Sequence, residues 1–193
     1  MDTPLGATGL LAGAISYALS VCALVEPGEM ARPTPCADWD LGTLLGHLSD
    51  SMADLETALR TGRLDLERPP GRAGGDSVEV LRDRAAELLC ASYCYAGLEA
   101  PENPERFVAV GGLPMPAGLV ACAGAVEIAV HGWDVAAALG GGAPIPAALA
   151  TRMLRLCPLL VAGREGLFAG PVEVPVQAGP GDRLVGYLGR HPG

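Results

Sequence analysis

The sequence predicts an all-α protein, with residues 1–193 forming a single up-and-down four-helix bundle that carries short C-terminal additions. Half of the residues are apolar but only 4% are aromatic, so the core must be built from Leu, Ala and Val, a mixture that favours helices. Apolar residues also recur at helical spacing in several long segments. Stretches rich in Pro and Gly, which end helices, separate these segments.

The first expected helix covers residues 6–25 and places Leu11, Ile15, Leu19 and Cys22 on one face. Residues 5–25 form an uncharged stretch of 21 residues, which is long enough to cross a bilayer. However, Gly and Ser line the opposite face, and no basic residues precede the stretch. We therefore expect a core-facing bundle helix, with neither a membrane span nor a signal peptide.

Two further helices follow, each preceded by an acidic capping residue. Asp40 is the expected N-cap of a helix over residues 41–60, whose leucines and methionine form an apolar stripe. Asp76 is the expected cap of a helix over residues 77–97. Residues 61–75 lie between them and, being rich in Gly, Pro and Arg, are predicted to be an exposed loop.

Residues 99–116 form a long connection rich in Pro and Gly, and a connection of this length often covers a functional site. The fourth helix is expected over residues 117–139 and ends at three consecutive glycines. A fifth, over residues 146–162, contains Pro158, which should kink or shorten it. Two short elements complete the expected fold, an extended piece at 172–176 and a helical turn at 182–188.

The net charge of −9 argues against nucleic-acid binding, because neutralising phosphates needs a basic face and none is visible. The cysteines are expected to be reduced, buried, small apolar residues of a cytoplasmic protein. Their positions are Cys22, Cys36, Cys90, Cys94, Cys122 and Cys157. Cys90 and Cys94 could share a helix face and bind a soft metal, but we favour the simpler interpretation.

Glu127 and His131 stand four residues apart in an apolar helical segment, so that both side chains can reach one point in space. His47 lies in another expected helix, beside its apolar stripe. Together they would provide the ligand types and number of an open catalytic metal site. The alternative is a helix-surface Glu–His pair that contributes a few tenths of a kcal/mol.

Three neighbours of the candidate ligands have less specific roles. Asp134 could accept a hydrogen bond from a ligand, although a solvated carboxylate fits equally well. Trp39 and Trp133 flank the candidate segments and are more simply explained by core packing.

Three motifs resemble one known family. Residues 33–40 (PTPCADWD), followed by 44–48 (LLGHL), resemble the N-terminal signature of the DinB-like, mycothiol-dependent maleylpyruvate isomerase superfamily. Residues 127–136 (EIAVHGWDVA) resemble its second signature. Residues 182–192 (DRLVGYLGRHP) look like the closing motif of its short, actinobacterial metal-binding branch.

The resemblance implies a DinB-like bundle that binds one divalent metal, usually zinc, through His47, Glu127 and His131. Water or a substrate thiolate would complete the coordination, and relatives use the metal to activate a thiol such as mycothiol as cosubstrate. Full-length isomerases of this superfamily carry a second, C-terminal domain, which we do not expect here. The resemblance therefore supports a metal site better than it supports any named substrate.

We accordingly expect a metal-dependent isomerase or S-transferase that acts on a small electrophile. Asp134 and Trp133, with Arg183 and Arg190 of the closing motif, are the candidates for supporting the ligands or binding substrate. One alternative is a thiol-independent Lewis-acid enzyme of specialised metabolism, catalysing hydrolysis, elimination or cyclisation. Another is a non-catalytic metal- or ligand-binding protein. The sequence leaves open whether the apolar helices form a homodimer.

Overall fold

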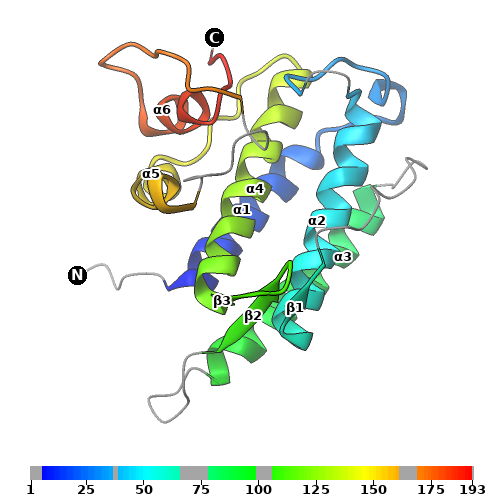
Figure 1. The fold of residues 1–193 in the computed structure, drawn as a ribbon. Coiled ribbons are helices and arrows are strands. Elements are labelled where there is room, and N and C mark those ends of the chain that lie inside the picture. The colour runs from blue at the N-terminus through cyan, green and yellow to red at the C-terminus, as the bar shows by residue number, and fades with distance from the viewer. Residues whose placement is uncertain (1–5, 37–38, 66–77, 99–105, 161–168, 193) are drawn as a thin grey trace.

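The protein is mostly helical, as the sequence predicts (Figure 1). The computed structural model describes residues 6–36, 39–65, 78–98, 106–160 and 169–192. The bundle is formed by α1 (Ala7–Cys22), α2 (Leu41–Thr61), α3 (Val78–Leu98) and α4 (Ala117–Ala138). Beside it lie α5 (Ala147–Leu160) and α6 (Pro180–Tyr187), the C-terminal additions. The expected Asp76 cap falls outside the described residues.

Helix α4 is the central helix of the core and packs most extensively against α1. Gly132 permits this approach, because a Cβ there would lie 3.1 Å from the Cα of Ala18. Among the described helices, α4 alone is long and apolar enough to cross a membrane, and 67% of its most apolar window is buried inside the protein. Its apolar character is thus accounted for by its position in the core.

Helix α2 is anchored at both ends. The Asp40 carboxylate accepts a hydrogen bond from the backbone N–H of Thr43 at 2.8 Å, which confirms the predicted N-cap. At the other end Gly62 adopts a left-handed conformation, with φ of +74°, and donates its N–H to Ala58. The short 3₁₀ helix η1 (Pro27–Glu29) begins the segment that leads from α1 into α2.

A small three-stranded sheet, which the sequence interpretation missed, corrects the predicted loops. Strand β1 (Arg63–Leu64) pairs in parallel with β2 (Phe107–Val110), and β2 forms an antiparallel hairpin with β3 (Leu113–Pro116). The hairpin turns at Gly111 and Gly112, both with positive φ. The described parts of both predicted loops therefore contain strands. Strand β1 follows the C-terminal end of α2, whereas His47 lies in the first half of that helix. Strand β3 precedes α4, whereas His131 lies in the second half of that helix. The sheet, at one end of the bundle in Figure 1, is therefore at the opposite end from both histidines and does not cover them.

The cysteines only partly follow the expected burial. Cys22 and Cys157 are buried, Cys36 and Cys122 are half-buried, and all six thiols are free. Cys90 and Cys94 are exposed, so the expectation was wrong for this pair. The reason is that α3 turns a different stripe inward, formed by Leu81, Ala85, Leu88 and Ser92.

The expected helical turn at 182–188 corresponds to α6, whereas the expected extended piece at 172–176 forms no strand in the described residues, and Pro158 lies inside α5 without ending it. Helix α5 continues past Pro158 to Leu160, and α6 packs against α5. The segment before α6 runs alongside it, and the N–H of Val172 donates to the carbonyl of Gly186 at 2.8 Å. This packing buries Leu184, Val185 and Leu188 and fixes the turn that follows α6.

Candidate metal centre

The structure brings together the side chains of His47 from α2 and of Glu127 and His131 from α4. The Nε2 atoms of both histidines lie 3.1 Å from the same carboxylate oxygen, Oε1 of Glu127. All three ligand atoms lie within 4.8 Å of one another. The side chain of His131 is 7% exposed, whereas those of His47 and Glu127 are 32% and 29% exposed. The group is therefore anchored in the core and open on one side.

The spacing of these atoms fits a small divalent ion. Ligands about 2.0–2.1 Å from a tetrahedral metal stand about 3.3 Å from one another, close to the 3.1 Å observed for both His–Glu pairs. Two imidazole nitrogens and one carboxylate oxygen are also a usual donor set for catalytic zinc. A modest separation of the three side chains would admit the ion between them.

His131 faces a carboxylate on each side of its ring. Its Nδ1 lies 3.0 Å from Oδ2 of Asp134, and its Nε2 lies 3.1 Å from Oε1 of Glu127. A neutral imidazole has one N–H, so it can donate to only one of these oxygens. If both carboxyl groups are ionised, either the ring carries a second proton or a cation lies between Nε2 and Glu127.

The charges of the protein groups agree with a positive charge beside Glu127. Burial opposes charge on His131, but its hydrogen-bond partners, Asp134 first among them, outweigh burial and raise the pKa of the ring well above its usual value. Burial likewise favours a neutral Glu127, yet hydrogen bonds from His131 and His47 outweigh it and hold the pKa of the carboxyl well below its usual range. The protonated imidazole and the ionised carboxylate thus favour each other.

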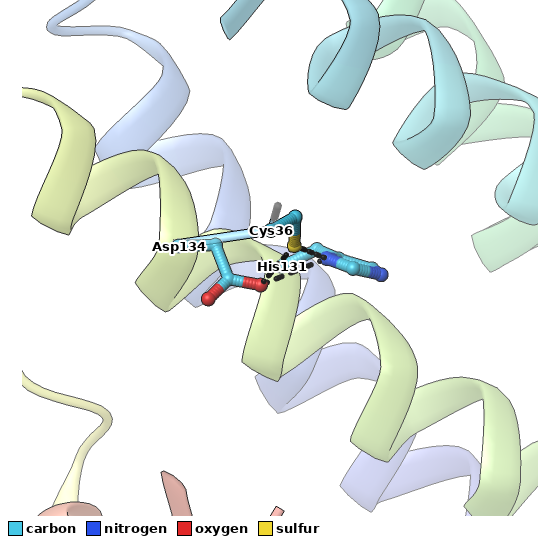
Figure 2. A group of neighbouring side chains, drawn as sticks. All are labelled: Cys36, His131 and Asp134. Carbon is cyan, nitrogen blue, oxygen red and sulfur yellow. Dashed lines mark hydrogen bonds and ion pairs between the residues drawn. The ribbon is translucent and has the colours of Figure 1, made fainter. Parts of the chain in front are cut away.

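Asp134 is fully buried and joins three parts of the chain. Its carboxylate accepts hydrogen bonds from Arg190 Nε at 3.2 Å and Nη2 at 2.8 Å, beyond α6. The thiol of Cys36, in the segment before α2, donates to Oδ2 at 3.2 Å (Figure 2). Asp134 thus contacts His131, one of the three candidate ligands, and its carboxylate is buried rather than solvated.

Cys36 is the residue of this cluster that the sequence interpretation missed. Its sulfur lies 3.8 Å from Nδ1 of His131. Cys36, His131 and Asp134 thus form a second group whose sulfur, nitrogen and oxygen atoms lie close enough together to hold a metal ion (Figure 2). The guanidinium of Arg190 already provides a positive charge there, 2.8 Å from Asp134 and 3.7 Å from the sulfur. The available signal was that Cys36 alone among the cysteines stands outside an apolar helical pattern.

The remaining candidates lie apart from the three ligands or only flank them. Trp39 packs on His47, with ring centroids 4.7 Å apart. Trp133 instead lines a shallow cavity of about 180 Å³ with Ala143 and Asp182, which none of the three ligands lines. Arg183 is exposed on α6, and no described contact joins it to the centre.

Comparison with known proteins places these residues in context. A family model described as the mycothiol maleylpyruvate isomerase N-terminal domain matches residues 11–136. Two uncharacterised proteins of Mycobacterium tuberculosis, from strains CDC 1551 / Oshkosh and ATCC 25618 / H37Rv, are each 27% identical over 175 residues. Each match covers 89% of this chain and 90% of the relative.

The fold also resembles a crystal structure of the mycothiol-dependent maleylpyruvate isomerase, with a TM-score of 0.53 and 17% identity. The match covers 77% of this chain and 66% of the isomerase, so this chain spans just under two thirds of that protein. The range matched by the family model contains His47, Glu127, His131 and Asp134 but ends before Arg190.

Proposed function

The chain belongs to the family of the mycothiol maleylpyruvate isomerase N-terminal domain, and on this premise we propose that it is a divalent-metal-dependent enzyme of the mycothiol-dependent isomerase or S-transferase type. The observation that carries the proposal is the convergence of two imidazole Nε2 atoms on one carboxylate oxygen, each at 3.1 Å. The metal is zinc, held by His47, Glu127 and His131.

The exposure of the site supports a fourth, exchangeable position. His47 and Glu127 are about one-third exposed, so a small molecule can approach from their side, while His131 anchors the site in the core. When bound, zinc supplies a Lewis acid that lowers the pKa of a thiol or water beside it. Trp39, whose ring lies 4.7 Å from that of His47 between centroids and is tilted by 51° to it, borders this side of the site.

The charges around the centre support an anionic reactant. Glu127 and Asp134 each contribute one negative charge, and Arg190 contributes one positive charge. With neutral histidines the protein groups sum to −1, so a divalent ion leaves an excess of +1. A thiolate or hydroxide beside the ion would neutralise this excess. The charge balance admits either anion, and the family, which is named for mycothiol, favours the thiol, so we infer that a thiol cosubstrate such as mycothiol attacks a small electrophilic substrate in the cytoplasm.

Metal analysis tests the proposed ligands. After purification and reconstitution with zinc, the wild-type protein should contain about one equivalent, and His131→Ala less than about a tenth. His191→Ala is the matched control, because His191 is exposed and outside the centre, and it should retain the metal. Less than a tenth of an equivalent in the wild-type protein would contradict the metal site and favour a non-catalytic protein.

A turnover assay tests the thiol. We expect the wild-type protein to consume mycothiol together with a member of a panel of small electrophiles, and His131→Ala to lose this activity with its metal. Turnover that is independent of mycothiol would favour the thiol-independent Lewis-acid enzyme instead. Full activity in the metal-free variant would refute metal-dependent catalysis in either form.

A further inference from the structure

Arg190 is held rigidly by the turn that follows α6. Its backbone N–H donates to the carbonyl of Val185, and its Nη1 donates to the carbonyl of Leu188, each at 2.9 Å. Gly189 makes this turn with φ of +84°, and a Cβ there would lie 2.7 Å from the carbonyl oxygen of Ala169. Only 11% of the Arg190 side chain is exposed. The guanidinium is thus placed by packing and by backbone contacts.

The guanidinium in turn fixes the carboxylate of Asp134. Nε and Nη2 of Arg190 bind Oδ1 and Oδ2 at 3.2 and 2.8 Å, a bidentate arrangement that sets the plane of the carboxylate. Oδ2 then lies 3.0 Å from Nδ1 of His131. An ionised carboxylate can only accept, so Nδ1 must be the donor. In the neutral ring, this leaves the lone pair on Nε2, which points toward Glu127.

We propose that Arg190 is a positioning residue of the metal centre: acting through Asp134, it holds His131 in the tautomer and orientation that present Nε2 as a ligand. This inference rests on the proposed metal site and adds to it a contribution from outside residues 11–136, the range that the family model matches. The C-terminal turn thereby becomes part of the centre. Arg190 binds both carboxylate oxygens of Asp134, and Asp134 binds Nδ1 of His131, so this chain of contacts is the route by which Arg190 acts on the ligand.

Zinc affinity, measured by competition with a chelating dye, tests the proposal. Removing a group that orients a metal ligand typically weakens binding by about 10–100-fold, and we expect this loss for Arg190→Ala. Arg190→Lys keeps the charge but not the bidentate geometry, so affinity should still fall and only partly recover. Arg183→Ala, on the exposed side of α6, should bind zinc within about twofold of the wild-type protein. If Arg190→Ala does not fold, Arg190→Lys decides the question.

A double-mutant cycle shows whether the effect passes through Asp134. Combining Arg190→Ala with Asp134→Asn should weaken zinc binding little more than Asp134→Asn alone, since both changes interrupt the same connection. Independent, multiplying losses would contradict the proposed connection.

NMR of the ¹⁵N-labelled imidazole of His131 provides a readout that general destabilisation would not change. In the metal-free protein at high pH, where the ring is neutral, we expect Nδ1 to be protonated in the wild type and the proton to redistribute toward Nε2 in Arg190→Ala. Unchanged zinc affinity and an unchanged ring spectrum in Arg190→Ala would overturn the inference. If the wild-type protein bound no zinc, the proposed function would fall, and the ring spectrum would decide alone whether Arg190 positions His131.

Discussion

Replacing Asp134 by Asn is the most direct test of how the buried charges stabilise the fold. The change keeps the size of the side chain but removes its negative charge. Asp134 accepts four hydrogen bonds, two from Arg190 and one each from His131 and Cys36. An amide has one acceptor oxygen and would turn N–H groups toward donors. Arg190 would then keep its charge, largely buried, without its partner.

The expected loss follows from the burial of this pair. Asp134 is fully buried, and the side chain of Arg190 is 11% exposed, so water cannot replace the lost carboxylate. Breaking such a pair by removing one partner costs about 3–5 kcal/mol of unfolding free energy. For a chain of 193 residues, each kcal/mol lowers Tm by about 2–4 °C. Asp134→Asn should therefore lower Tm by about 6–20 °C.

The measurement is thermal and urea unfolding followed by circular dichroism, with EDTA present so that metal affinity does not contribute. Asp83→Asn, an exposed change of the same chemistry on α3, is the matched control and should stay within about 0.5 kcal/mol of the wild type. A loss below about 1 kcal/mol for Asp134→Asn would refute the reasoning, because it would mean that the carboxylate contributes little more than a surface pair.

Three further predictions concern other parts of the molecule. Zinc at 100 times its Kd should stabilise the wild-type protein by about 2.7 kcal/mol, raising Tm by about 5–11 °C, and Glu127→Gln should lose most of this shift in the same thermal assay. Gly189→Ala should lower the free energy of unfolding, measured in urea, by about 1 kcal/mol or more, because the φ of +84° disfavours a side chain and a Cβ would clash with neighbouring backbone. Gly170→Ala is the control and should be nearly neutral, because a Cβ there would meet open space. Asp40→Ala should lower Tm at neutral pH by removing the cap on the N–H of Thr43. Because this hydrogen bond lowers the pKa of Asp40 in the folded protein below 3.8, the difference in Tm between variant and wild type should be complete above that pH and vanish as the pH falls through the folded pKa. A difference in Tm that persisted at low pH would contradict an ionised cap.

The helices were largely predictable because each depends on a local pattern. The Asp40 cap and the apolar stripe of α2 fix where that helix begins and which face it buries. The hairpin was missed because its Pro and Gly content was taken as evidence for a loop, although FVAV before Gly111-Gly112 is a hairpin pattern. Cys90 and Cys94 were misplaced because the apolar pattern of α3 did not show which face meets the bundle.

The sequence by itself determined the bundle and nominated the three candidate ligands, because helical spacing places Glu127 and His131 on one face and few histidines were available. Only the tertiary structure decided that His47 reaches the same carboxylate oxygen, since that contact depends on the packing of α2 against α4. It also decided that Cys36 and Arg190 meet at Asp134, although they are 154 residues apart in the chain. Such contacts arise from how separate elements dock, and no local periodicity encodes them.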